Sequence, residues 1–186
     1  MQFLQFVKLL TDENGLHISA RNVTVSTCGL VPQMRMLAKE HLQITLALSL
    51  HATTDEKRRK LMPIAYKYTI AEIRDACKFY FEQTGRRITF EYSLVGGVND
   101  TQEDADELVA LARPLNCHIN LIPVNPIKER EFASSDMENV RKFAAILEKN
   151  GMTATVRRTL GPDINASCGQ LRNRENQIRK QILSDT

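Results

Sequence analysis

The chain has 186 residues, of which 42% are hydrophobic and 25% charged, and its formal net charge is +3. These values are ordinary for a soluble globular domain, and the mild positive charge permits a nucleic-acid partner without requiring one. The four cysteines lie far apart, which excludes closely spaced zinc or iron–sulfur ligands and a small disulfide scaffold. We therefore expect free thiols and a cytoplasmic location.

The first ten residues are apolar but carry no basic leader and no small-residue cleavage site. They are also too few to span a membrane, so we expect no membrane partner. The sequence predicts a buried helix here.

Strand-like and helix-like segments alternate through the rest of the chain. The strand-like segments, rich in β-branched and apolar residues, are residues 23–27, 44–50, 88–95, 118–123 and 153–158. Segments this apolar suit strands that are covered on both faces, as in a parallel sheet.

Three helices are indicated between these strands. Thr69 and Glu72 form a capping box at the start of the first, and the other two open near Thr101 and Ser135. Cys77 lies on the apolar stripe of the first helix, so we place it in the core. Repeated strand–helix–strand units predict an α/β fold with a parallel sheet.

Ligands of such sheets bind beyond the carboxyl ends of the strands. Small hydroxyls, a histidine, glycines and asparagines follow four of the expected strands, at residues 26–29, 49–51, 96–100 and 123–126. Together they predict a pocket for a polar small molecule. The alternative is that the serines and asparagines only cap the helices that follow.

Cys168 stands in a loop rich in glycine and asparagine, after the last strand-like segment. Arg157, Arg158, Arg172 and Arg174 flank the loop. Positive charge favours the reactive thiolate and would also attract an RNA phosphate. The alternative is a small core cysteine.

Two further features have two readings each. His51 is either an acid–base group or a hydrogen-bonding residue that closes a strand. The charged run at residues 55–60 is either a solvated helical turn or a contact with RNA.

Six motifs occur together in one order, and jointly they are specific. They are residues 21–32, 46–52, 58–64, 90–100, 120–126 and 163–171. In this order they resemble the adenine-carbon-2 RNA methyltransferases of the radical S-adenosylmethionine (SAM) superfamily, the RlmN/Cfr type. The resemblance runs from about residue 14 to residue 173.

The resemblance implies a methyl transfer to carbon 2 of adenine in large-subunit ribosomal RNA and some transfer RNAs. The positions that resemble SAM contacts are Ser26, Ser49, Leu50, His51 and Asn125. Cys168 resembles the cysteine that receives a methyl group from one SAM. In the family, a second SAM is cleaved at a [4Fe–4S] cluster to activate that methyl group, and a second cysteine helps to release the product.

The implied fold is part of a radical-SAM-type (β/α) barrel, in one domain of residues 1–186. Within it we expect a remnant helix and loop at 1–20, β/α repeats at 21–160, and a loop with Cys168 and a basic tail at 161–186. The Cys-x-x-x-Cys-x-x-Cys motif of the family is absent from the sequence. We therefore expect the carboxyl-terminal portion of such an enzyme, without metal ligands of its own and inactive alone.

Two other functions stay open at this stage, a non-catalytic RNA-binding module and an inert folded remnant. We also expect self-association, because the strand at residues 23–27 would have an unpaired edge.

Overall fold

The computed structural model describes residues 2–124 and 133–157. Its strands are β1 (Thr24–Thr27), β2 (Thr45–Ser49), β3 (Ile88–Gly96), β4 (Cys117–Pro123), β5 (Ala133–Ser134) and β6 (Ala154–Val156). Its α-helices are α1 (Gln2–Thr11), α2 (Val31–Lys39), α3 (Asp55–Leu61), α4 (Ile70–Thr84), α5 (Gln102–Ala112) and α6 (Met137–Lys149). Short 3₁₀ helices span Ala20–Asn22 and Pro63–Tyr66.

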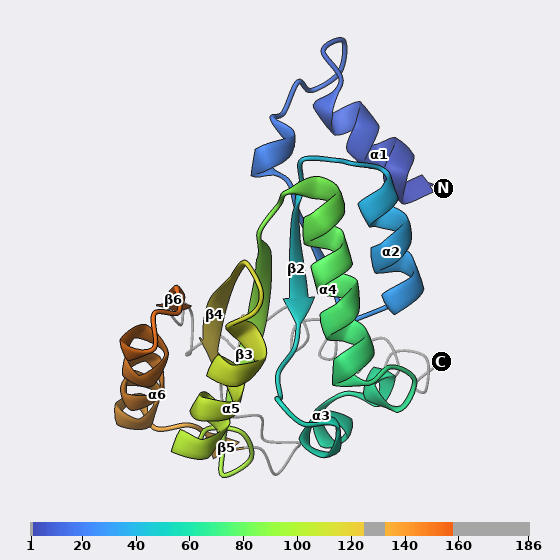
Figure 1. Cartoon of the computed structure of the whole chain (residues 1–186). Helices are drawn as coiled ribbons and strands as arrows, with labels where there is room; N and C mark the ends of the chain where they lie inside the picture. The colour runs from blue at the N-terminus through green and yellow to red at the C-terminus, as the bar shows by residue number, and fades with distance from the viewer. Residues whose placement is uncertain (1, 125–132, 158–186) are drawn as a thin grey trace, which may run out of the picture.

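Five strands form a parallel sheet in the order β1-β2-β3-β4-β6, and β5 pairs antiparallel with the end of β3. The α/β fold and the parallel sheet are as the sequence predicts. Each strand lies beside the next long strand in the chain, and β1 is at one edge (Figure 1). A sheet wound in one direction places its connecting helices on the same side.

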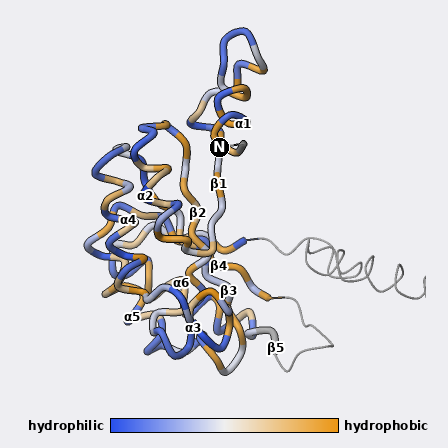
Figure 2. Tube along the Cα trace, turned by 90° about the vertical axis from the view of Figure 1, so that its right-hand side faces the viewer, coloured by the Kyte–Doolittle hydropathy of each residue, from blue (hydrophilic) through white to orange (hydrophobic). Residues whose placement is uncertain are grey.

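The helices accordingly cover one face of the sheet, as Figure 2 shows for α2, α4 and α5. On this face Leu48, Phe90 and Tyr92 are buried, and the ring of Tyr92 lies 5.5 Å from that of Phe143 in α6. The expectation of strands covered on both faces is therefore wrong for the described residues. The reason is the winding, since a second helical layer requires the strand order to reverse.

The opposite face carries polar side chains that are half-buried or exposed. Its members, placed by strand register, are Thr24, Ser26, Thr45, Ser49, Thr89, Glu91, Ser93, His118, Asn120 and Thr155. We call this set the polar face. It alternates with the buried apolar residues because successive strand residues point to opposite sides.

The helix starts agree with the sequence. The capping box of Thr69 and Glu72 is formed, and Thr101 with Asp104 forms a second one at the start of α5. Cys77 is fully buried on α4, which confirms its place in the core.

Helix α1 differs from the expected buried helix. Val7 is buried, but Phe3, Phe6 and Leu9 are exposed. The helix therefore buries one apolar side chain and leaves other apolar side chains uncovered within the described residues. None of the described helices is both long enough and apolar enough to cross a membrane.

Candidate functional site

Two of the polar side chains predicted at the strand ends, Ser26 and Ser49, belong to neighbouring strands and lie on the same face of the sheet. Ser26 is next to last in β1 and Ser49 is the last residue of β2. The register pairs Ser26 with Ala47, which is two residues before Ser49, so both hydroxyls are on the polar face. Ser26 is exposed and Ser49 is half-buried. The carboxyl end of the sheet thus presents two hydroxyls from neighbouring strands.

His51 follows two residues after β2, in the left-handed region with φ of 59°. Its Nδ1 accepts the backbone N–H of Ser93 at 3.1 Å. Because a backbone amide can only donate, Nδ1 carries no proton and the neutral ring carries its proton on Nε2. Burial, and secondarily the charge of Arg58, lowers the pKa of His51 to about 4. His51 is therefore a fixed neutral donor at pH 7, which favours the hydrogen-bonding reading over acid–base work.

Asn99 fixes the backbone around His51. It is fully buried, and its Nδ2 donates to the carbonyls of His51 at 2.6 Å and Ser93 at 2.7 Å. Its Oδ1 accepts the N–H of Val95 at 2.7 Å. One amide side chain therefore joins the turn after β2 to the end of β3. The sequence placed residue 99 in the expected rim but did not indicate this role.

The loop after β3 is tied in turn to the start of α6. Asp100 accepts the Gly97 N–H at 2.9 Å, the Ser135 hydroxyl at 2.6 Å and the Asn139 amide at 2.8 Å. This carboxylate is almost fully buried. We interpret its role as holding the loop, since the three described donors, from Gly97, Ser135 and Asn139, are all neutral.

Leu50 lies between Ser49 and His51, but its side chain is buried in the core. Its N–H donates to the Glu91 carbonyl at 3.0 Å, and its carbonyl accepts from Arg58. Both of its backbone polar groups therefore already have partners within the chain.

The charged run at residues 55–60 proves to be mixed. Arg58 is fully buried, so it is neither solvated nor available to RNA. Arg59 and Lys60 are exposed; Arg59 lies over the Tyr66 ring, and Lys60 pairs with Glu56 at 2.8 Å. The reading of this run as a solvated turn or an RNA contact is thus wrong at Arg58.

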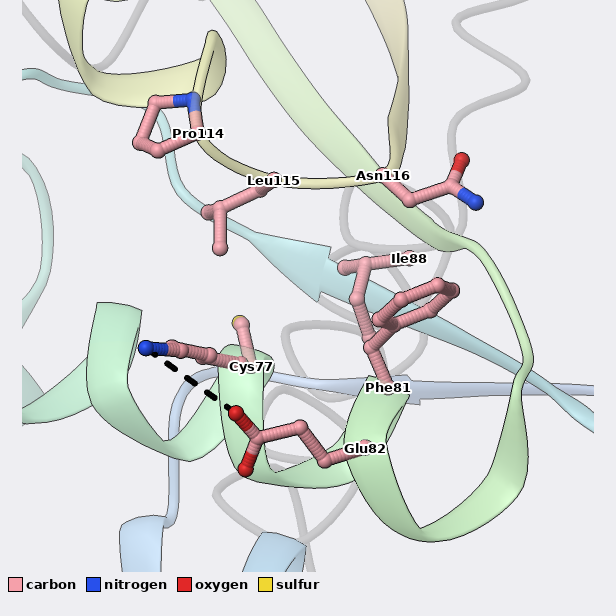
Figure 3. A pocket seen from close by; sticks show the side chains of 8 residues that line it. Cys77, Phe81, Glu82, Ile88, Pro114, Leu115 and Asn116 are labelled. Atoms are coloured by element: carbon pink, nitrogen blue, oxygen red, sulfur yellow. Dashed lines mark ion pairs between the residues drawn. The ribbon is translucent and has the colours of Figure 1, made fainter.

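A separate pocket of about 230 Å³ lies at the opposite ends of the strands, lined by Ile88, Asn116 and the side of α4 (Figure 3). Cys77 is at its wall, and an ion pair of Lys78 with Glu82 spans 3.9 Å at its edge. Burial raises the pKa of the Cys77 thiol to about 12, so the thiolate needed for a nucleophile or a metal ligand does not form. This pocket therefore does not belong to the site at the strand ends.

The three cysteines in the described part of the chain are not grouped as ligands of one metal centre. Cys28 follows β1, whereas Cys77 and Cys117 belong to the core side of the sheet with thiols whose pKa burial raises. Within residues 2–124 and 133–157, no three histidine, cysteine or acidic side chains are grouped to hold a metal. Two members of the expected site, Asn125 and Cys168, lie outside the described residues, as do Arg158, Arg172 and Arg174, which flank the Cys168 loop in the sequence.

Comparison with known proteins supports the reading of these motifs. The chain is 58% identical over 171 residues to a probable dual-specificity RNA methyltransferase RlmN of Lachnospira eligens, covering 92% of this chain and 49% of that protein. A relative of the same name in Clostridium perfringens is 57% identical over 169 residues. The chain is a homologue of the RlmN methyltransferases. It spans about half the length of the relatives it matches.

Solved structures agree with this RlmN homology. A radical SAM methyltransferase from Sphaerobacter thermophilus has a TM-score of 0.85 and 46% identity, over 90% of this chain and 49% of that one. A domain of a pyruvate-formate lyase-activating enzyme from Bacteroides vulgatus has a TM-score of 0.62 at 16% identity, and supports the fold alone. No family model matches the chain.

Proposed function

We propose that this chain is the SAM-holding part of an RlmN-type RNA methyltransferase. The observation that carries the proposal is the convergence of Ser26, Ser49 and His51 at two neighbouring strand ends of the polar face. Hydroxyls and a neutral imidazole N–H suit a polar ligand with hydroxyl, amino and carboxylate groups. In the proposal Asn125 completes this contact set, and Leu50 contributes by holding Ser49 and His51 on either side of it.

SAM, when bound, would supply the methyl group. The chain's own part is to bind and orient it. Ser49 pairs in register with Glu91 of β3, and Glu91 pairs in turn with Asn120 of β4. The ligand would thus meet hydroxyls, a fixed donor and a carboxylate acceptor on one surface. Since the described helices cover only the other face, a ligand would reach these groups without displacing the core that residues 2–124 and 133–157 form.

Cys168 is proposed as the methyl acceptor. Its thiolate would take the methyl group of SAM, which leaves S-adenosylhomocysteine (SAH) and a methyl thioether on the cysteine. The basic residues around it favour the thiolate form. In the proposal the methylated position is carbon 2 of adenine in large-subunit ribosomal RNA and some transfer RNAs. Because the Cys-x-x-x-Cys-x-x-Cys motif does not occur in this sequence, we assign the chain no radical step, and we expect no methylation of RNA by the chain alone.

The SAM proposal is tested by titrating the ¹⁵N-labelled chain with SAH. Weak binding is expected, and the amide signals of Ser26, Ser49 and His51 should move while that of Cys77 stays. Ser49→Ala should weaken binding, whereas Ser19→Ala, a change at an exposed serine far from the rim, should not. Signals that move only around Cys77, or none at saturating SAH, would refute the assignment.

RNA is the proposed partner. Among the cations expected to contact RNA, Arg59, Lys60 and Arg157 are exposed in the described part of the chain. Arg158, Arg172 and Arg174 are known from the sequence alone. Binding to a ribosomal RNA hairpin should be weak. The logarithm of the association constant should fall linearly with the logarithm of the salt concentration. Affinity that does not change with salt would exclude phosphate contacts as the source of binding.

A further inference from the structure

Arg58 of α3 is a charged side chain in an unusual place. Its guanidinium is fully buried, yet no carboxylate of the described residues lies within ion-pair distance of it. It donates instead to three backbone carbonyls: Nη2 to Cys28 at 2.7 Å and to Ser49 at 3.3 Å, and Nε to Leu50 at 3.1 Å. Among the described residues, Nη1 is buried without a partner.

Such an arrangement is costly for stability. A buried cation loses its hydration, and three neutral carbonyls compensate less than a carboxylate would. Burial accordingly lowers the pKa of the Arg58 guanidinium. An apolar side chain of similar length would fill the same space without this cost. The benefit must therefore lie in what the guanidinium holds in place.

The three carbonyls belong to the two strand ends that form the site. Cys28 comes two residues after Ser26, and Leu50 lies directly between Ser49 and His51. A planar guanidinium offers donors in a fixed fork, so it can hold several acceptors at a set separation. Lysine has one nitrogen and cannot reproduce that fork.

We propose that Arg58 is a positioning residue for the cofactor site, whose guanidinium fastens the carboxyl ends of β1 and β2 to each other. This inference rests on the proposed function, since the residues it aligns are the proposed SAM contacts Ser26, Ser49 and His51.

Gly29 supports the inference independently. It has φ of +95°, and a Cβ built there would lie 3.2 Å from Arg58 Nη2 and 2.9 Å from Ile73 Cδ1. The turn after β1 thus approaches the guanidinium more closely than any other residue type would allow. The turn after β1 is thus packed closely against both Ile73 and Arg58.

The test compares Arg58→Met and Arg58→Lys with Arg59→Met, the matched control at the adjacent exposed arginine. The first readout is the ¹⁵N signature of the His51 ring, which reports an unprotonated Nδ1 bonded to Ser93. In both Arg58 variants the ring signals should no longer correspond to one state with an unprotonated Nδ1. In Arg59→Met the ring signals should be unchanged. The second readout is SAH affinity, which should fall about tenfold in Arg58→Met and less in Arg58→Lys, but less than about twofold in Arg59→Met.

The readouts separate two kinds of failure. If the unmodified chain does not bind SAH, the proposed function fails, and the His51 signature still decides the role of Arg58. Folded Arg58 variants with an unchanged His51 signature would overturn the inference. If neither variant folds, Gly29→Ala replaces them, because the added methyl group in the turn after β1 would crowd Arg58 Nη2. It should shift the His51 ring signals, and unchanged signals would overturn the inference equally.

Discussion

The ring of His51 is held by the backbone N–H of Ser93, which donates to Nδ1 over 3.1 Å. This bond crosses from the turn after β2 to β3, and it decides which ring nitrogen keeps the proton. A histidine held in this way acts as a hydrogen-bond donor of constant charge across the physiological range.

The first prediction concerns the pH dependence of stability. The pKa of His51 is about 4 in the fold, below the value near 6.5 of an unfolded chain. As pH falls, the unfolded chain therefore binds the proton first. The contribution of neutral His51 to the free energy of unfolding is therefore complete above about pH 6.5. It is lost progressively as the pH falls from there to about 4.

Urea unfolding at about pH 7.5 and pH 5 checks this, with His51→Asn as the comparison. Asparagine tolerates a positive φ but does not titrate. The unmodified chain should lose more stability over this interval than the variant. Equal losses would show that His51 titrates normally in the fold.

The second prediction concerns the ion pair of Lys57 with Asp104, which spans 2.7 Å between α3 and α5. The Asp104 side chain is fully buried, so Lys57→Met leaves a buried carboxylate whose described donors are the N–H and hydroxyl of Thr101. We expect a loss of about 2 kcal/mol in the free energy of unfolding. Lys60→Met removes the exposed pair with Glu56 on the same helix, and should change stability by less than about 0.5 kcal/mol. Similar losses in both variants would contradict this reading.

The third prediction compares two glycines with positive φ. Gly29→Ala meets Ile73 and Arg58, whereas no atom lies within 4 Å of a Cβ at Gly97. Gly97→Ala should cost about 1 kcal/mol from backbone strain alone. Gly29→Ala should cost about 1–3 kcal/mol more, because it adds steric overlap in a packed region. Thermal unfolding of both variants measures the difference, and equal costs would show that the turn after β1 relaxes freely.

The fourth prediction concerns self-association. Phe3, Phe6 and Leu9 are exposed on α1, and β1 pairs only with β2 among the described strands. An uncovered apolar surface and an open strand edge both favour contact with another copy. Sedimentation velocity should show association that increases with concentration and that Phe6→Glu weakens.

The control is Gln5→Glu, which changes the charge of the same helix at an exposed polar position. It should leave association unchanged. A monomer at every concentration would show that the apolar side of α1 is covered in solution.

The sequence predicts the strands and the later helices well because their signals are local. Thr69 with Glu72 marks a helix start by its own hydrogen bonds. Helix α2 was not predicted, because Gly29 and Pro32 stand near its start and only Met34, Leu37 and Ala38 are buried along it.

The site was predicted in part. The rim residues could be found because polar side chains at the carboxyl ends of parallel strands share one edge. The burial of Arg58 could not, because it stands among Lys57, Arg59 and Lys60, and a charged run gives no sign of which member points inward. The sequence did not predict the polar face because Ala47 belongs to that side of β2. With an alanine there, β2 has a continuous apolar pattern rather than an alternating one.

The polar face has a consequence for how the chain finds its fold. If β3 slipped by one residue against β4, Glu91 would turn toward the helices and Phe90 toward the opposite face. Such a register is strongly disfavoured, since it buries a carboxylate and exposes an aromatic ring. Glu91, which we propose faces the ligand, therefore also disfavours incorrect strand pairing. Substitutions that make this face apolar are expected to reduce the fidelity of folding as well as the affinity for a ligand.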